Sequence, residues 1–253
     1  MLSTLLPAEV FSLLLVFVRV GSAVMLMPGI GDPYVSPRIR LLFALLIALA
    51  VTPLVAEQLP PLPESATLLA LVILAEMVIG LFLGGLARLM MAALTTAGMV
   101  IAYMSSLANA LIDDPSAAQQ GSIAGSFLTM VAMLVIFTLD LHHMILRGVV
   151  DSYLLFEPGQ PLPVGDFAAF VTQVVSQSFL LSMQIAAPFV AVGLIFYLGI
   201  GLLARLMPQV QIFFVALPLQ VTMGLVILLL VLPVAIRWFV TGFEETLLPF
   251  TAG

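Results

Sequence analysis

The sequence lacks cysteine and carries very little charge. None of its 253 residues is cysteine, only 8% are charged, and all seven basic residues are arginine. Without cysteine the chain has no disulfide framework and no thiolate metal site. A formal charge of -6 with no basic run argues against nucleic acid as a partner, because phosphate neutralisation needs clustered Lys or Arg.

Hydrophobic residues make up 63% of the chain, more than a water-soluble fold could bury, and they lie in several long blocks. Since no block alternates polar and apolar residues as a barrel strand must, helices remain. We therefore expect an all-α, polytopic integral membrane protein, with residues 1–253 as one domain and the first block retained as a membrane segment. About six apolar helical blocks are expected, at residues 10–27, 41–56, 66–112, 123–139, 167–204 and 212–236.

The arginines predict how the chain crosses the membrane. Connectors rich in proline and glycine separate the blocks and would end helices. With six crossings, four of the arginines fall on one side, which should be cytoplasmic. They are Arg38, Arg40, Arg88 and Arg205. Both termini are then predicted outside, in the periplasm of a bacterium.

The blocks differ in length, and several do not match the about 20 residues that one membrane span needs. Blocks 41–56 and 123–139 are short, whereas 167–204 is uncharged and roughly twice the needed length. Part of this apolar surface must therefore pack on protein instead of lipid. Pro188 and the glycines at 193, 199 and 201 are natural break points, so some helices should be kinked and not simple bilayer spans.

Residues 29–32 spell Gly-Ile-Gly-Asp, the G-x-G-D pattern of intramembrane aspartyl proteases. Such chemistry needs a second carboxylate that shares a proton with Asp32. No Tyr-Asp dipeptide exists, and the motif lies between Pro28 and Pro33, in a connector, which favours a tight turn. We expect no enzyme, and keep the protease as a lesser alternative.

His142 and His143 follow Asp140 at the end of an apolar block, where a proton relay or a metal could be considered. Adjacent histidines are expected to point to different helix faces, and no further carboxylate or histidine stands at ligand spacing. An interfacial position at a helix end is the better interpretation. The sequence thus predicts no metal site and no cofactor.

Arg19 and Glu76 lie inside apolar blocks, where an ionisable group is costly and by default marks a partner or a pathway. They could pair with each other, with backbone carbonyls or with a neighbouring subunit. In a stand-alone secondary transporter, the alternative function, Glu76 and Arg19 would form a proton or ion site. Internal inverted repeats would favour a transporter, and we find none.

Glycines recur along residues 80, 84 and 85, and again along residues 193, 199 and 201. This spacing lets helix backbones approach closely, so it predicts dense helix packing.

Three stretches carry a further pattern. They are residues 19–53, with Arg19, Pro28, Gly31, Pro37, Arg38, Arg40 and Pro53; residues 76–115, with Glu76, Gly80, Gly84, Arg88 and Ala97-Gly98; and residues 201–219, with Arg205, Pro208 and Pro218. Their order and spacing resemble the FliR family of flagellar export components, whose injectisome relatives are called SctT. The chain departs from the family at Met99, where a glutamate is frequent, and at Ser105 and Ser106, where a glycine is usual.

The resemblance implies a non-enzymatic subunit of the type III export gate in the bacterial inner membrane, at the flagellar basal body. Several FliP-like and FliQ-like subunits and one FliR would surround a central pore, contacted by an FlhB-like subunit and bounded by membrane lipid. Unfolded export substrates would pass through it. In this family the helices form hairpins that pack into the assembly.

By the same resemblance, residues 104–121 would lie at the pore and help to plug it at rest. The polar residues of this stretch suit a water-facing constriction, and a simple exposed connector fits equally well. The pore or plug candidates are Met104, Ser105, Ser106, Asn109, Leu111, Ile112, Asp113, Asp114, Pro115, Gln119 and Gln120. The intramembrane charged or structural candidates are Arg19, Glu76, Arg88 and Arg205, and the turn residues are Pro28, Gly31, Pro37, Arg40, Pro208 and Pro218.

Overall fold

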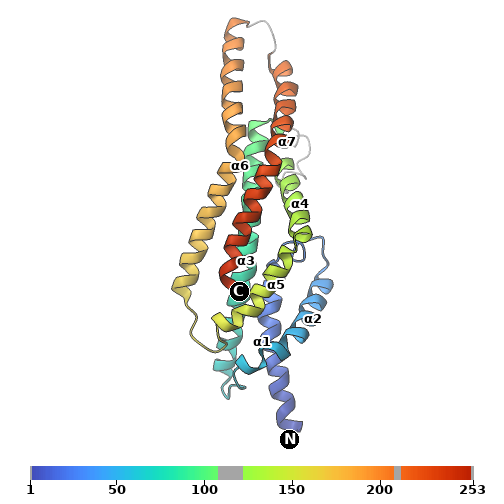
Figure 1. The fold of residues 1–253 in the computed structure, drawn as a ribbon, viewed down its shortest axis with the longest axis vertical. Coiled ribbons are helices and arrows are strands. Elements are labelled where there is room, and N and C mark those ends of the chain that lie inside the picture. The colour runs from blue at the N-terminus through green and yellow to red at the C-terminus, as the bar shows by residue number, and fades with distance from the viewer. Residues whose placement is uncertain (1, 108–121, 208–211, 252–253) are drawn as a thin grey trace. The chain divides into compact units, whose positions relative to one another are not determined.

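The computed structural model describes residues 2–107, 122–207 and 212–251, and these residues are almost entirely helical (Figure 1). No strand occurs among them, which confirms the all-α prediction. The elements in chain order are α1 (Leu2–Leu26), α2 (Pro37–Val55), η1 (Ala56–Gln58), α3 (Ala66–Met104), α4 (Ile123–Thr138), α5 (Leu141–Leu155), α6 (Val164–Leu206), α7 (Ile212–Leu247) and η4 (Leu248–Phe250).

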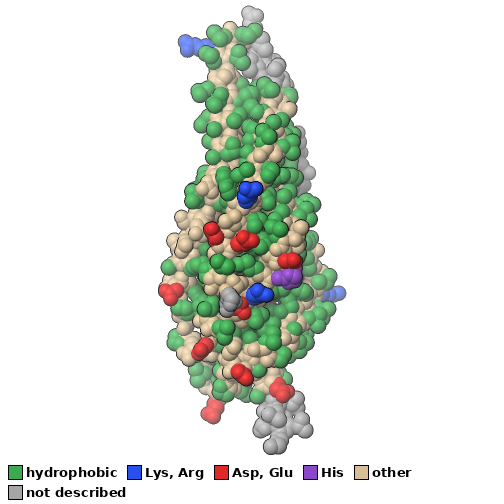
Figure 2. Space-filling model, viewed as in Figure 1, with side chains coloured by type: hydrophobic (Ala, Val, Ile, Leu, Met, Phe, Trp, Pro, Cys, Tyr) green, Lys and Arg blue, Asp and Glu red, His purple; other side chains and the backbone are tan. Residues whose placement is uncertain are grey.

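Within these described ranges, five helices are long and apolar enough to cross a membrane, namely α1, α2, α3, α6 and α7. The pair α4 and α5 makes a sixth candidate if it counts as one broken span, because the two helices meet at a bend of 70°. The prediction of about six apolar helical blocks is thus confirmed. In Figure 2, hydrophobic side chains cover most of the visible surface and charged ones are few.

The segment after Leu139 was expected to be a connector, and this expectation is wrong for residues 141–155. They form α5, which buries one side through Leu141, Ile145, Gly148, Val149, Ser152 and Tyr153. Positions separated by three or four residues share a helix face, so this is an amphipathic helix. Its histidines, Arg147 and Asp151 concealed it from a search for uncharged blocks.

Local sequence sets several helix boundaries. Ser36 caps α2 by accepting a hydrogen bond from the backbone N–H of Ile39, and Pro37 occupies the first turn, where its missing N–H costs nothing. Other prolines lie inside helices: Pro188 in α6, and Pro218 and Pro233 in α7, so the prediction of Pro218 as a turn residue is wrong. Each helix continues past them, as membrane helices do when surrounding groups satisfy the freed carbonyl.

Two compact units divide the chain. Unit 1 comprises residues 1–89, 136–174 and 243–253, and unit 2 comprises residues 90–135 and 175–242. In unit 1, α1 packs along α2 and its buried residues include Leu15, Val16, Val20, Ile79 and Leu83. In unit 2 the buried residues include Leu94, Ile101, Leu128, Ala132 and Phe189. The interpretation of residues 1–253 as one domain stays a prediction.

Glycines permit the closest helix contacts, as predicted, at some of the expected positions. In unit 1, a Cβ at Gly80 would overlap the Arg19 carbonyl oxygen, and one at Gly84 would meet the Ala23 oxygen at 2.5 Å. In unit 2, a Cβ at Gly98 would overlap the backbone of Gly125 on α4. Gly193 packs against Met104.

Gly199 and Gly201 make no such close contact with the described residues of this chain, so dense packing at these two glycines stays a prediction. A Cβ at either position would meet no described atom within 4 Å. These two glycines therefore provide open positions on the same α6 helix.

The glycine contacts give a test of helix packing. Gly98→Ala should lower the free energy of unfolding by about 1–3 kcal/mol, because the new methyl group must displace backbone, which cannot move aside as a side chain can. Gly199→Ala is the matched control and should not lower it, because the methyl group meets no described atom and alanine favours a helix interior over glycine by about 0.5–1 kcal/mol. Thermal or chemical unfolding in detergent measures both, and equal effects would contradict the packing described for α3 and α4.

Candidate functional site

Arg19 of α1 and Glu76 of α3 form a fully buried ion pair in unit 1, each with 0% of its surface exposed. The guanidinium binds the carboxylate through two atoms: Nε donates to Oε2 at 2.6 Å and Nη2 donates to Oε1 at 2.9 Å. The planar fork of arginine matches a carboxylate in this way. Of the partners left open by the sequence, the structure thus shows two for Arg19: Glu76, and also a backbone carbonyl, that of Phe156.

The remaining donors of Arg19 bind α5 and the residue that follows it. Nη1 donates to the Ser152 hydroxyl at 3.1 Å, and Nη2 donates to the Phe156 carbonyl at 2.9 Å. The Tyr153 ring lies against the guanidinium, with its centroid 3.8 Å from Cζ, a cation–π contact. One arginine therefore joins three helices that are far apart in the sequence.

The backbone near the pair is shaped to bring α1 and α3 together. Gly80 lies one turn after Glu76, and the Arg19 carbonyl oxygen and the Ser22 hydroxyl occupy the space that a Cβ would need. The Ser22 hydroxyl donates to the carbonyls of Val18 and Arg19, so it is satisfied within α1. The close approach and the ion pair depend on the same helix faces.

Both carboxylate oxygens of Glu76 are bound to Arg19, and neither side chain is exposed. A proton or ion site that loads and unloads needs access and a free ligand position, and this arrangement offers neither. Removing one partner of a buried pair leaves an uncompensated charge, which costs about 3–5 kcal/mol. The geometry is that of a structural clamp between α1, α3 and α5.

An aromatic cluster lies in the same unit. The rings of Phe82 and Phe167 stack at 4.2 Å between centroids, and each of the rings of Phe156, Phe170 and Phe250 lies 5.0 to 6.2 Å from one of these two. Such ring pairs stabilise beyond their buried area. The cluster fastens η4 and the start of α6 to α3.

The G-x-G-D stretch forms a turn organised by Asp32. One carboxylate oxygen of Asp32 accepts a hydrogen bond from Arg88 at 3.1 Å, and the other accepts from the Gly29 N–H at 2.9 Å and the Tyr34 hydroxyl at 3.2 Å. Desolvation, and next the Asp32 carboxylate, raise the pKa of Tyr34, so this hydroxyl keeps the proton that it donates. Among the described residues Asp32 faces Arg88 and not a second carboxylate, so this geometry does not support the protease.

The same turn explains two of the predicted turn residues. Gly29 has a φ of 89°, which favours glycine, and a Cβ at Gly31 would overlap the Met25 carbonyl oxygen. Arg40 donates to the carbonyls of Val35 and Gly31, at 3.1 and 3.3 Å. The connector between α1 and α2 is therefore a built structure.

Three of the predicted pore or plug residues are described, and they end α3 in unit 2. Ser105 is buried and leaves no room for a Cβ at Gly224, and Ser106 has a φ of 58°. The Gln220 amide donates to the Met104 carbonyl at 2.7 Å and to the Tyr197 hydroxyl at 2.9 Å. Neither Gln220 nor Tyr197 was predicted from the sequence, although an amide inside the apolar block 212–236 was a visible signal.

The remaining predicted site residues are either exposed or lie outside the described part of the chain. Arg205 lies in the last turn of α6 and is exposed. Several candidates lie outside the described residues, namely Asn109, Leu111, Ile112, Asp113, Asp114, Pro115, Gln119, Gln120 and Pro208.

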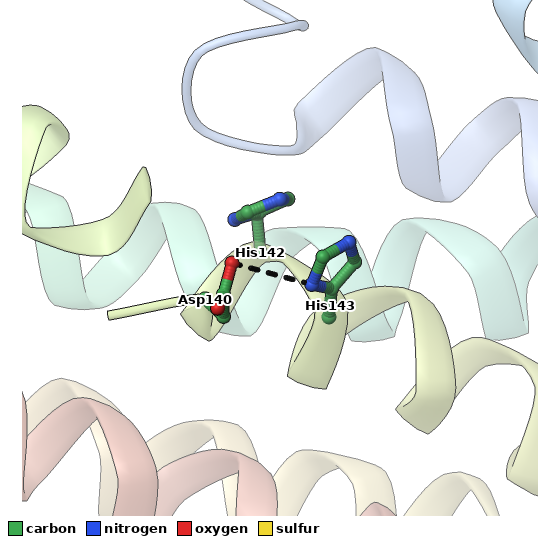
Figure 3. Close-up of side chains that lie close together, drawn as sticks. All are labelled: Asp140, His142 and His143. Carbon is green, nitrogen blue, oxygen red and sulfur yellow. Dashed lines mark ion pairs between the residues drawn. The ribbon is translucent and has the colours of Figure 1, made fainter. Parts of the chain in front are cut away.

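Asp140, His142 and His143 lie close together in unit 1 at the start of α5 (Figure 3). The two imidazole rings are 4.1 Å apart between centroids, and His143 Nδ1 is 3.5 Å from Asp140 Oδ1. The expectation that the adjacent histidines point to different helix faces is therefore wrong, whereas no further carboxylate or histidine joins these three among the described residues, as expected. Because α5 begins only after a sharp break, the side chains of Asp140 and of the first turn do not follow the spacing of one continuous helix.

Comparisons with known proteins agree on one group. The family model described as "Bacterial export proteins, family 1" matches residues 10–246. The chain is 43% identical to the "Flagellar biosynthetic protein FliR" of Caulobacter vibrioides, over 91% of this chain and 92% of the relative. It is 30% identical to the protein of the same name from Escherichia coli, over 85% and 82%, and 27% identical to the "Yop proteins translocation protein T" of Yersinia pestis, over 69% and 67%.

The buried ion pair predicts that removing Arg19 alone destabilises the chain more than removing Arg19 and Glu76 together. Arg19→Met should lower the free energy of unfolding by about 3–5 kcal/mol, because Glu76 stays buried without its partner. The double variant Arg19→Met with Glu76→Leu should recover much of this loss. Denaturant unfolding in detergent measures both variants.

Arg88→Met is the matched control, since the Arg88 side chain is 46% exposed and its pair with Asp32 is worth about 1 kcal/mol or less. If Arg19→Met proved no more harmful than this control, the clamp would lose its support.

Proposed function

Because this chain belongs to family 1 of the bacterial export proteins, we propose that it is a structural and gating subunit of the flagellar type III protein export channel. It assembles with FliP-like and FliQ-like subunits around a central pore, contacts an FlhB-like subunit, and lets unfolded export substrates cross the inner membrane. It performs no catalysis of its own. Its place is the flagellar basal body.

The length of the apolar helices carries this proposal. The 43 residues of α6 extend about 65 Å and the 36 residues of α7 about 54 Å, whereas the hydrocarbon core of a bilayer is about 30 Å thick. Transmembrane helices tilt by about 20° on average, which cannot absorb this excess. Part of the apolar surface of α6 and α7 therefore needs a cover other than lipid.

These helices also bury little of their surface within the chain. In the most apolar windows of α6 and α7 only 22% and 17% of the residues are buried. Their outward side chains are large and aliphatic, and include Leu194, Ile195, Leu198, Leu202, Leu203, Leu206, Leu225, Val226, Leu229 and Leu230. An uncharged surface of this kind suits the helices of partner subunits.

The clamp of Arg19 and Glu76 fits a subunit better than a transporter. A stand-alone secondary transporter would use Glu76 as a proton or ion site, yet both of its oxygens are bound and it is fully buried. The intramembrane charges instead stabilise the scaffold. A purified monomer that transports solute would restore the transporter hypothesis.

The charged residues at the two ends of α2 support one orientation of the chain across the membrane. Arg38 and Arg40 lie at its start, and Glu57 and Glu64 lie beyond its end. Under the positive-inside rule the start of α2 is cytoplasmic. Both termini of the chain then lie in the periplasm.

We keep residues 104–121 as the pore segment that helps to plug the channel at rest. Its described start supports this role, because the Met104 carbonyl is held by Gln220 and Ser105 is packed on Gly224. A gating segment needs a fixed point of attachment, and the end of α3 offers one.

Assembly can be tested by site-specific cross-linking, since the chain has no cysteine of its own. Leu198→Cys, at a side chain 75% exposed on α6, should cross-link to a FliP-like or FliQ-like subunit in cells that express the native partners. Ala186→Cys is the matched control, because Ala186 is on the same helix and 0% exposed, and should not react. If Leu198→Cys, Leu202→Cys and Leu229→Cys all failed to reach another subunit, the assembly surface would be refuted.

Deleting residues 110–120 tests the plug. The assembled complex should then leak ions or small solutes, which a vesicle flux assay detects, whereas the complex of the unaltered chain stays tight. Equal tightness of the two complexes would contradict a plug in this segment.

A further inference from the structure

We propose that Asp140, His142 and His143 form a binding site for a divalent transition-metal ion of the zinc class, at the break between α4 and α5. The site lies within unit 1, outside the Arg19–Glu76 clamp. It does not rest on the export function proposed above.

The ligand atoms already converge. One ligand atom from each of the three residues lies within 4.8 Å of the other two, and Asp140 Oδ1 is 3.5 Å from His143 Nδ1. Around a tetrahedral zinc ion with bonds of about 2.0–2.1 Å, neighbouring ligand atoms are about 3.3 Å apart. Two ligands thus have nearly the required separation, and rotation of the third side chain can close the rest. Figure 3 shows the Asp140 carboxylate beside the His143 ring, with the His142 ring above them.

The Asp140 carboxylate is not used to cap the helix. Asp140 holds the N-cap position of α5, where an aspartate usually accepts hydrogen bonds from the first backbone N–H groups. Here it makes no side-chain cap and adopts a left-handed conformation with φ of 57°. Aspartate tolerates this conformation better than most residues, so the break directs the carboxylate toward His143.

His142 supplies an independent observation. Its side chain is half-buried, packs against Phe137 with ring centroids 4.8 Å apart, and has an enclosed Nδ1 without a hydrogen-bond partner among the described residues. A buried polar atom without a partner is uncommon and calls for an explanation. Coordination of an ion by this imidazole would supply one.

The donor set selects the class of ion. Two imidazoles and one carboxylate suit zinc, nickel or cobalt and do not suit magnesium or calcium, which prefer all-oxygen sites. A cavity of about 330 Å³ lies beside the cluster, lined by Asp140, His143, Met144, Arg147 and Thr251. This cavity has room for water molecules at the remaining coordination positions of the ion. The positive charge of Arg147 keeps the affinity of the site for the ion moderate.

A bound ion would fasten the break itself. Asp140 lies in the break between α4 and α5, and both histidines belong to the first turn of α5. The same helix carries Ser152 and Tyr153 to Arg19. Metal binding would thus stiffen the element that completes the clamp.

The sequence makes the test clean. Both histidines of the chain lie in this cluster and there is no cysteine, so no other imidazole or thiolate competes for the ion. The full chain, purified in detergent without a polyhistidine tag, is titrated with Zn²⁺ by calorimetry and with Co²⁺ by visible absorption. We expect one ion per chain, with absorption bands of imidazole-bound cobalt.

His143→Gln and Asp140→Asn should each weaken Zn²⁺ binding by about tenfold or more, since each removes one ligand. Asp166→Asn is the matched control: it removes an acidic side chain from the first turn of α6 and should leave binding unchanged. Because the His143 and Asp140 side chains are 69% and 73% exposed, the variants should keep the melting temperature of the metal-free chain.

Zn²⁺ should raise the melting temperature of the unaltered chain and not of the His143→Gln chain. Absence of saturable binding to the unaltered chain would overturn the proposal. So would binding that survives both ligand substitutions at full strength.

Discussion

The placement of α1, α3 and α5 depends on one buried arginine. Arg19 satisfies Glu76, the Ser152 hydroxyl and the Phe156 carbonyl at once, in a position with no exposed surface. Two charges can remain in such a place only if each is paired and hydrogen-bonded, so these helices are held in one register. Gly80 allows the approach that the pair requires. This clamp stabilises the packing of α1, α3 and α5. It does not involve the exposed faces of α6 and α7, which can contact partner subunits.

Those outer faces impose a second constraint. Helices of about 54 to 65 Å that are apolar almost throughout cannot be covered by a bilayer core of about 30 Å. Contacts within the chain cover little of the surface of these helices, because few residues in their most apolar windows are buried. The chain belongs to a bacterial export family, which implies a complex of several subunits, and this agrees with the assembly surface proposed on α6 and α7. The hydrophobicity of the chain thus reflects assembly as much as insertion.

The sequence predicted the features that depend on composition and missed those that depend on local geometry. Long uncharged runs revealed the apolar helices, and the cost of burying charge marked Arg19 and Glu76, although it could not choose their partner. The amphipathic α5 was missed because its polar side chains interrupt the apolar pattern. The proximity of His142 and His143 follows from the left-handed Asp140, and the open space at Gly199 from tertiary packing, neither of which spacing alone reveals.

The central claim is that this chain is one part of a larger gate and not a working monomer. The most direct measurement is the mass, or an image, of the complex that it forms when extracted from membranes in mild detergent. We expect one copy of the 27.0 kDa chain together with several FliP-like and FliQ-like subunits. A stable particle containing this chain alone would contradict it.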